Sequence, residues 1–161
     1  MPNWCQNNVT ISGDEKKVKA FIKFVKSKQS KFDFNKIYPM PKELEGTVSG
    51  SEDLKSDEQK ANSELWKVEF GADNWYDWKN LHWGTKWELN SDDIEMTDYG
   101  DYVEYSFDTA WSPPLGILEE LNRKFHFKKD EDLHIQWHYR EDGVGFTGYL
   151  EHELEDYDDN N

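Results

Sequence analysis

Apolar residues recur with two different periods along the chain, and each period predicts one kind of element. A period of three to four residues, typical of a helix with one buried face, is found in two segments. The first contains Val18, Phe21, Ile22 and Val25, and the second contains Ile117, Leu118, Leu121 and Phe125. We expect the first helix to open with a capping box over 12–15, and the second with a Ser112 cap followed by Pro113.

A period of two residues predicts strands over 7–12, 94–98, 102–111 and 133–139. Within the third strand, Val103, Tyr105, Phe107, Thr109 and Trp111 fall on one face. Asp142-Gly143 is typical of a tight hairpin turn after the fourth strand. Closing the hairpin there places Tyr139 opposite Phe146 and Trp137 opposite Gly148, where the missing side chain leaves room for the indole.

Four of the eight tryptophans, Trp75, Trp78, Trp83 and Trp87, are concentrated in one stretch. The first two fall on one face of a short helix, which Asp73 would cap and Gly84 would end in a left-handed turn. After Gly84 the period becomes two, which predicts a strand over 85–90. This stretch is expected to form the centre of the core, because Trp buries a large apolar area.

Residues 45–64 carry few apolar side chains among Gly, Ser and charged residues, which favours a flexible insertion. A helix is expected to begin near Asp57 and to run to Phe70. Residues 154–161 are strongly acidic and are predicted to form a disordered tail. The preceding residues, 1–153, have the length of a single domain.

The expected order of elements is strand, helix, an irregular helical part, two or three strands, helix and two strands. This order predicts an α+β fold with a mostly antiparallel sheet, helices packed on one face and an extra helical insertion. A ferredoxin-like core fits this arrangement.

Charge is unevenly distributed along the chain, whose formal net charge is −15. Residues 1–42 carry a net charge of +6, and residues 43–161 carry −21. An acidic surface would repel nucleic acid and anionic membranes and would suit a basic partner, although solubility alone also explains it. The lysines of the first predicted helix fit a solvated face, with phosphate binding as the alternative.

Cys5 is the only cysteine, so no disulfide can form within the chain and a reducing compartment is expected. A buried free thiol is its expected state, since no partnered base supports a role as a nucleophile. The chain opens without a signal-like leader and contains no apolar run of the roughly 18 residues that a membrane helix needs. We therefore expect a soluble, cytoplasmic protein that does not bind membranes.

Five aromatic-rich blocks are distributed from residue 1 to about residue 150. They are Met1-Pro-Asn-Trp-Cys5 with Asn7, Ile37-Tyr-Pro-Met-Pro41, Trp83-Gly-Thr-Lys-Trp87, Thr109-Ala-Trp-Ser-Pro-Pro114, and Tyr139-x-Glu141 with Phe146-x-Gly148. Together these blocks resemble the YubB-type ferredoxin-like domain family, the Api-like proteins that phages, prophages and plasmids encode. His82 departs from the family pattern, which has Asn there. The resemblance implies a ferredoxin-like topology and a bacterial host, and it brings no catalytic residues.

The sequence contains no P-loop, nucleophile elbow, His-Glu-x-x-His or paired-Cys motif, so no enzyme, metal site or cofactor is predicted. A single Cys also excludes an iron–sulfur cluster held by four thiolates. His134 and His138 share a strand face but lie about 13 Å apart, too far for one metal ion. Solvent-exposed histidines are expected, with a cross-strand site between His134 and Glu151 as the alternative.

Seven residues form the candidate recognition surface: Trp83, Gly84, Thr85, Lys86, Trp111, Ser112 and Pro113. They would meet if the predicted hairpin brings their strands together. Clustered Trp with Lys is how proteins stack bases or hold peptides. Packing of the same Trp residues in the core is the competing interpretation.

Three functions are weighed on these observations. The first is a non-enzymatic binding or accessory protein of a mobile element, which contacts a basic host or phage protein and in one version mimics nucleic acid. The second is a single-stranded nucleic-acid-binding module that uses sheet aromatics and the Lys-rich first helix, although the net charge argues against nucleic acid as a partner. The third is an enzyme with an unrecognised site. The sequence specifies no oligomeric state.

Overall fold

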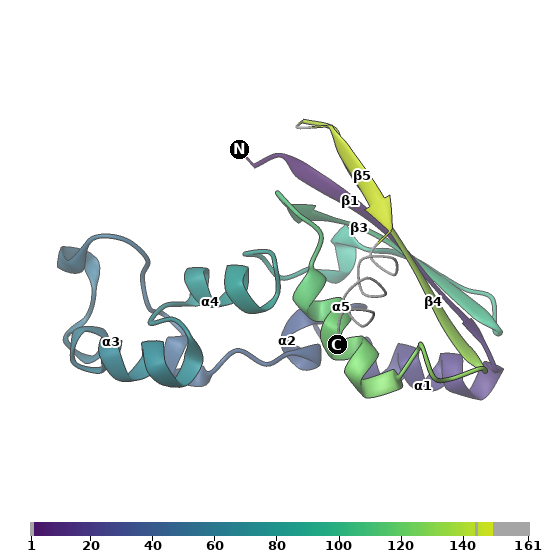
Figure 1. The fold of residues 1–161 in the computed structure, drawn as a ribbon, viewed down its shortest axis with the longest axis horizontal. Helices are drawn as coiled ribbons and strands as arrows, with labels where there is room; N and C mark the ends of the chain where they lie inside the picture. Colours follow the sequence, from purple (N-terminus) through teal and green to yellow (C-terminus); the bar gives the residue numbers. More distant parts are fainter. Residues whose placement is uncertain (1, 144, 150–161) are drawn as a thin grey trace, which may run out of the picture.

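The computed structural model describes residues 2–143 and 145–149, and it has the expected α+β architecture (Figure 1). A five-stranded antiparallel sheet has the strand order β2-β3-β1-β4-β5. Its strands are β1 (Trp4–Gly13), β2 (Glu95–Asp98), β3 (Tyr102–Ala110), β4 (Leu133–Glu141) and β5 (Phe146–Tyr149). This confirms the predicted antiparallel sheet, with β5 added at the edge beside β4.

The helices are α1 (Glu15–Val25), α2 (Phe34–Ile37), α3 (Asp57–Phe70), α4 (Trp75–His82) and α5 (Leu115–Phe125). Three short 3-10 turns occupy Lys42–Leu44, Glu52–Leu54 and Ser91–Asp93. α1, α2 and α5 lie against one face of the sheet, whereas α4 and α3 extend away from it (Figure 1). The chain order β1-α1-β2-β3-α5-β4 is that of a ferredoxin-like fold, and α2, α3 and α4 form the extra helical insertion.

Both predicted amphipathic helices are present, but their predicted caps are wrong. Asp14, not Ser12, caps α1, and its carboxylate accepts a hydrogen bond from the Lys17 N–H. Ser12 cannot cap α1, because β1 continues through Gly13 and holds Ser12 in the sheet. α5 begins without a side-chain cap, because the Ser112 hydroxyl donates to a carbonyl outside the helix.

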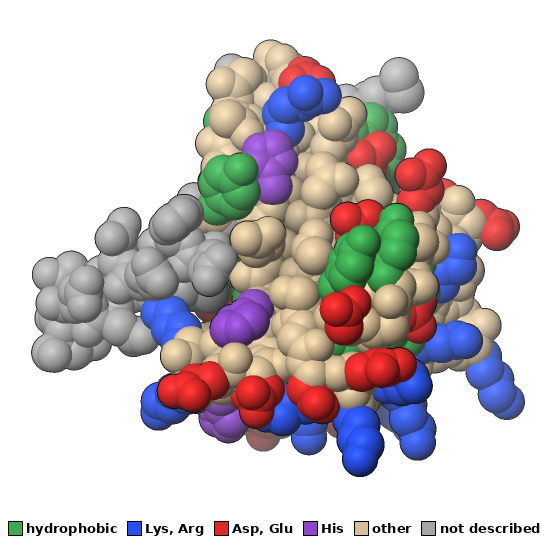
Figure 2. Space-filling model, turned by 90° about the vertical axis from the view of Figure 1, so that its right-hand side faces the viewer, with side chains coloured by type: hydrophobic (Ala, Val, Ile, Leu, Met, Phe, Trp, Pro, Cys, Tyr) green, Lys and Arg blue, Asp and Glu red, His purple; other side chains and the backbone are tan. Residues whose placement is uncertain are grey.

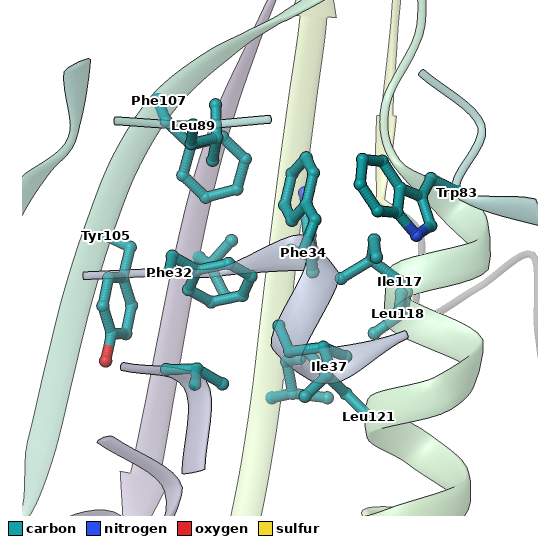
Figure 3. Close-up of a cluster of buried hydrophobic side chains, with 14 of the residues drawn as sticks. Phe32, Phe34, Ile37, Trp83, Leu89, Tyr105, Phe107, Ile117, Leu118 and Leu121 are labelled. Atoms are coloured by element: carbon teal, nitrogen blue, oxygen red, sulfur yellow. The ribbon is translucent and has the colours of Figure 1, made fainter. Parts of the chain in front are cut away.

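The core lies between the sheet and the covering helices, and aromatic rings interlock at its centre (Figure 3). Phe32 contacts Tyr105, Phe107 and Trp137 with ring centroids 5.1, 5.3 and 6.0 Å apart. These three partners come from the inward faces of β3 and β4, as the alternation predicted. Trp83 is fully buried and contacts this group through Phe34.

Only part of the Trp-rich stretch belongs to the core. Trp78 and Trp83 are buried and Trp75 is half-buried, but Trp87 is 42% exposed. The helix over these residues is α4, as predicted, and Gly84 after it has a φ of 87°. The expectation that all four tryptophans would fill the core was therefore wrong at Trp87.

The strand predicted over 85–90 is absent from the structure. At one end of this segment, Thr85 Oγ1 donates to the Ala110 carbonyl at the end of β3. Shortly after the other end, the Ser91 N–H donates to the Gln29 carbonyl in the loop that follows α1. Held at both ends by non-sheet contacts, the segment does not pair with β3.

Asn7 is a buried polar centre that links the three middle strands. Its amide nitrogen donates to the Cys5 carbonyl and to Thr109 Oγ1, and its amide oxygen accepts from Trp137 Nε1 at 3.1 Å. All of these groups are buried, so the hydrogen bonds offset their lost hydration. Burial also raises the pKa of the Cys5 thiol to about 11, which confirms a buried thiol that stays protonated at neutral pH.

The β4–β5 hairpin has a different register from the one predicted. Tyr139 pairs with Gly148 instead of Phe146. The turn is wider than Asp142-Gly143, because the Glu141 carbonyl accepts a hydrogen bond from the N–H four residues later. The shift is two residues, so each side chain keeps its predicted face. Gly148 makes room for the Tyr139 hydroxyl, which would lie 2.7 Å from a Cβ there, and not for an indole.

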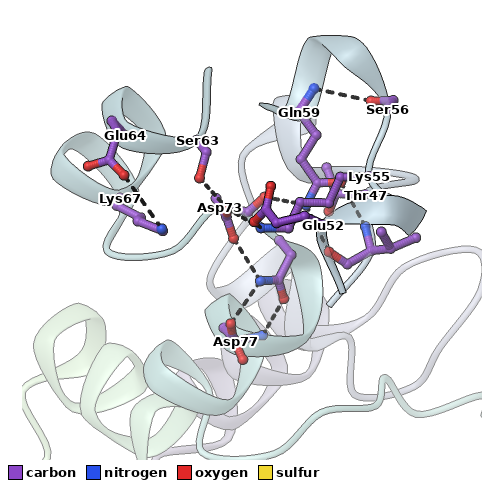
Figure 4. A network of polar contacts seen from close by, with 12 residues as sticks. Thr47, Glu52, Lys55, Ser56, Gln59, Ser63, Glu64, Lys67, Asp73 and Asp77 are labelled. Carbon is purple, nitrogen blue, oxygen red and sulfur yellow. Dashed lines mark hydrogen bonds and ion pairs between the residues drawn. The ribbon is translucent and has the colours of Figure 1, made fainter. Parts of the chain in front are cut away.

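The arm, residues 42–73, is anchored to α4 by a buried polar network (Figure 4). Lys55 Nζ lies 3.1 Å from the Asp73 carboxylate, and the two side chains are 7% and 4% exposed. Ser63 and Asn74 donate hydrogen bonds to the same carboxylate. Burial opposes ionisation of Asp73, but these donors outweigh it and hold its pKa at about 2.

The limits of α3 agree with the prediction, whereas the cap of α4 does not. α3 begins at Asp57 and ends at Phe70, as predicted, with Ser56 as its cap and Gly71 in a left-handed conformation. Asp73 does not cap α4, because its carboxylate is used in the buried ion pair and Asn74 accepts from the Asp77 N–H instead. The flexibility proposed for 45–64 stays a prediction, and the acidic tail lies outside the described residues.

Tyr105→Phe is expected to stabilise the protein by about 1 kcal/mol, because the Tyr105 hydroxyl is buried without a hydrogen-bond partner among the described residues. Thermal unfolding should shift upward by about 3 °C. Tyr38→Phe is the matched control, since the Tyr38 hydroxyl is bonded to His82 Nδ1 at 2.9 Å and its loss should destabilise. Equal shifts for the two variants would contradict this account.

Candidate functional site

The two segments of the predicted recognition surface are brought together at the C-terminal end of β3. The Ser112 hydroxyl donates to the Gly84 carbonyl at 2.6 Å. The Gly116 N–H donates to the Trp83 carbonyl at 3.1 Å. Residues 83–86 and 111–113 are therefore neighbours in space, as the sequence suggested.

Two of these seven residues lie in the interior, so they cannot form part of an exposed recognition surface. Trp83 and Thr85 are fully buried, and Trp83 Nε1 donates to the Tyr38 carbonyl. Gly84 and Pro113 lie against each other, with a Cβ at Gly84 placed 3.2 Å from the Pro113 carbonyl oxygen. For Trp83 and Thr85, the competing interpretation of core packing therefore fits the structure, and recognition by the other five residues stays a prediction.

Trp111 is the exposed member of the set, and Lys86 is half-buried. Trp111 is 50% exposed, and its φ of 71° turns it away from the buried face of β3 on which it was predicted. Lys86 Nζ lies 4.2 Å from the centroid of the Trp87 ring, which is a cation–π contact.

A cleft of about 610 Å³ opens beside these residues, at the end of the sheet where β1 begins. Two tryptophans line it, Trp4 at 46% exposure and Trp87 at 42%, with ring centroids 5.8 Å apart. Three acids also line it, Glu88, Asp93 and Asp108. Leu89, Asn90, Thr109 and Ala110 complete its lining, which includes no Lys or Arg.

The missing strand explains why the cleft exists. β2 pairs with β3 only from Val103 to Ser106. Beyond that point, Asp108 and Ala110 of β3 line the cleft together with residues of segment 87–93, which contains no strand. A strand over 85–90 would have closed this space against β3.

The carboxylates of the cleft differ in their partners. Glu88 is paired with Lys79 at 3.2 Å. Asp93 and Asp108 have neither an ion pair nor a side-chain hydrogen bond to the described residues. Loss of hydration raises the pKa of Asp108 above its usual value, because no cation compensates for it. The cleft therefore presents uncompensated negative charge beside exposed aromatic surface.

The described part of the chain contains no group of three His, Cys, Asp or Glu side chains that could hold a metal ion. His138 Nε2 lies 3.0 Å from the Thr147 hydroxyl on β5, and its ring contacts Tyr149. The alternative metal site of the sequence paired His134 with Glu151, which lies outside the described residues. Within those residues, no helix has the length and apolar character needed to span a membrane.

Sequence reasoning missed Trp4, Glu88, Asp93 and Asp108 as site residues. A signal for two of them was present, because alternation with buried Cys5 and Phe107 places Trp4 and Asp108 on the open face of the sheet. Nothing in the sequence showed that Trp87 would leave the core and meet Trp4.

Comparison with known proteins supports the fold. Residues 82–159 match the family model of the ferredoxin-like domain in Api92-like protein. The chain is also similar to the crystal structure of a protein api92 from Yersinia pseudotuberculosis, with a TM-score of 0.53. That alignment covers 92% of this chain and 93% of the other at 12% identity, so it shows the fold alone. No curated protein matches the sequence.

Proposed function

We propose that this chain is a non-enzymatic accessory protein of a mobile genetic element, which binds a basic protein in the cytoplasm of the bacterial host. The observation that carries the proposal is the cleft, whose lining combines three acids with two exposed tryptophans and includes no cation. Exposed apolar surface with charge of one sign is typical of a protein interface for a partner of opposite charge. The mobile element is inferred from the resemblance of the aromatic blocks to Api-like proteins.

The charge distribution supports a basic partner. The segment that contains the cleft residues after Trp4, 43–161, carries a net charge of −21. Such a field speeds the approach of a basic protein and repels anionic ones. In the nucleic-acid-mimic version of this proposal, the partner is a host protein whose basic groove normally holds DNA or RNA, and the carboxylates take the place of phosphates.

The arrangement of lysines and tyrosines makes direct nucleic-acid binding the weaker alternative. The ring of exposed Tyr99 stacks on that of half-buried Tyr102, and Tyr102 alternates with buried residues of β3, on the open face of the sheet. α1 packs on the opposite, covered face, so its lysines are not aligned with these tyrosines. In Figure 2, Lys and Arg gather along the lower rim together with a row of acidic side chains, and acidic side chains also surround a hydrophobic patch higher on this face.

Pull-down from bacterial lysate tests the proposed function. The wild-type protein is expected to capture a basic protein at about 50 mM salt and to release it at about 500 mM, because screening weakens charge pairing. An Asp93→Asn/Asp108→Asn variant should lose this protein. The matched control is Glu64→Gln/Glu69→Gln, which removes the same charge from exposed positions on α3.

Three results separate the versions of the proposal. Retention of the partner by the control and its loss from the cleft variant would support binding at the cleft. Competition by duplex DNA would support the mimic version. Equal capture by both variants, or capture that resists salt, would overturn the assignment of the partner to this cleft.

A further inference from the structure

The two tryptophans of the cleft form one aromatic wall beside its three acids. Trp4 comes from the first residue of β1 and Trp87 from the irregular segment after α4, and their rings are inclined at 38°. Each ring remains more than 40% exposed although the two are in contact. Exposed indole pairs are costly for a soluble surface unless they have a ligand, because they leave a large apolar area in water.

The chemistry of the remaining walls selects a cation. Asp108 comes from β3 and Asp93 from the 3-10 turn Ser91–Asp93; both line the same cleft, and neither carboxylate is paired within the described residues. The face of an indole carries negative electrostatic potential, so it attracts a cation that the carboxylates also attract. The contact of Lys86 with the Trp87 ring shows this attraction within the chain itself.

We propose that this cleft binds a single arginine side chain of the partner, with its guanidinium stacked on the wall formed by Trp4 and Trp87 and hydrogen-bonded to Asp108. Arginine fits better than lysine, because a planar guanidinium can stack on an aromatic ring and donate in its own plane to a carboxylate at the same time. The inference rests on the proposed function, since it names the group by which a basic partner is recognised.

Substitution of Lys86 tests whether the guanidinium binds at the Trp87 ring. Its ammonium group lies at the Trp87 ring and also 5.8 Å from the Tyr76 ring, so it is a like charge close to the incoming guanidinium. Lys86→Gln is therefore expected to strengthen arginine binding about threefold. If arginine bound elsewhere on the acidic surface, Lys86→Gln would strengthen its binding less, because salt screens the Lys86 charge over a longer distance.

The binding experiment uses a short peptide with one arginine in an otherwise uncharged sequence, and matched peptides with citrulline or lysine at that position. Citrulline keeps the shape of arginine without its charge. Nuclear magnetic resonance of the tryptophan indole N–H groups detects weak binding in the full-length protein. Trp4→Phe and Trp87→Phe variants assign the two relevant signals.

The arginine peptide should shift the Trp4 and Trp87 signals in a saturable manner and leave the signals of buried Trp66 and Trp137 unchanged. Asp108→Asn should weaken binding about tenfold, and the citrulline peptide should bind about tenfold more weakly than the arginine peptide. Glu64→Gln on α3 should change nothing.

Binding that is equal for citrulline and arginine, that does not respond to Asp108→Asn, or that fails to saturate would overturn the arginine site. Tighter binding of the lysine peptide would also overturn it.

The proposed function and the arginine site can be refuted independently of each other. Loss of a captured protein from the Asp93→Asn/Asp108→Asn variant without arginine binding would leave the proposed function standing. Arginine binding without capture of any basic protein would leave only the site.

Discussion

Gly116→Ala is expected to lower the free energy of unfolding by about 3 kcal/mol, because α5 approaches the end of α4 too closely for any side chain. A Cβ at Gly116 would overlap the carbonyl oxygen of His82 and come within 3.2 Å of the Trp83 Cα. Both are backbone atoms, so no rotamer change can relieve the clash. Separating the helices would also break the hydrogen bond from the Gly116 N–H to the Trp83 carbonyl.

Thermal unfolding of Gly116→Ala should therefore occur about 10 °C below that of the wild type. Glu119→Ala is the matched control, since it places alanine at an exposed position of the same helix. Its midpoint should stay within about 2 °C of the wild type. A Gly116→Ala midpoint that resembled this control would show that the contact between α4 and α5 is looser than described.

Asp73→Asn is expected to destabilise the protein by about 2–3 kcal/mol, because it removes the charge that balances Lys55 inside the arm. The Asp73 carboxylate accepts hydrogen bonds from Lys55, Ser63 and Asn74, and an amide cannot replace its charge. Urea unfolding at pH 7 measures the loss. The control is Glu64→Gln, which breaks an exposed ion pair with Lys67 and should cost little.

The difference between wild type and Asp73→Asn should also depend on pH. The pKa of Asp73 is about 2 in the folded protein, below the ordinary value of 3.8. A lowered folded-state pKa contributes stability that is present above the unfolded-state pKa and is lost as the pH falls through the folded-state pKa. The stability difference should therefore be constant above about pH 4 and shrink towards pH 2. A difference that stayed unchanged down to pH 2 would contradict the assigned role of Asp73.

Prediction from sequence succeeded where a single element has a consistent pattern. The spacing of Val18, Phe21 and Val25 predicted α1, and the alternation from Leu133 to Tyr139 predicted β4, because each pattern buries one face of one element. The limits of α3 followed from its polar start and from Gly71 at its end. For these elements, local periodicity and tertiary burial favour the same structure.

Prediction failed where a contact distant in sequence competed with the local pattern. Residues 85–90 alternate as a strand would, yet Thr85 contacts Ala110 through its side chain and the segment forms no strand beside β3. A distant partner also decides the role of Asp73, whose position before α4 fits a cap but whose carboxylate bonds with Lys55, eighteen residues earlier in the chain. In both cases the competing partner cannot be identified from local spacing.

By itself, the sequence determined the α+β class, most of the elements, the aromatic core and the acidic surface, because composition and periodicity fix burial within an element. Only the tertiary structure decided the candidate site. It placed Trp83 and Thr85 in the interior, and it brought Trp4, Trp87 and Asp108 together at the end of the sheet. The physical reason is that a cleft depends on which elements fail to pair, and pairing is settled by contacts between segments far apart in the chain.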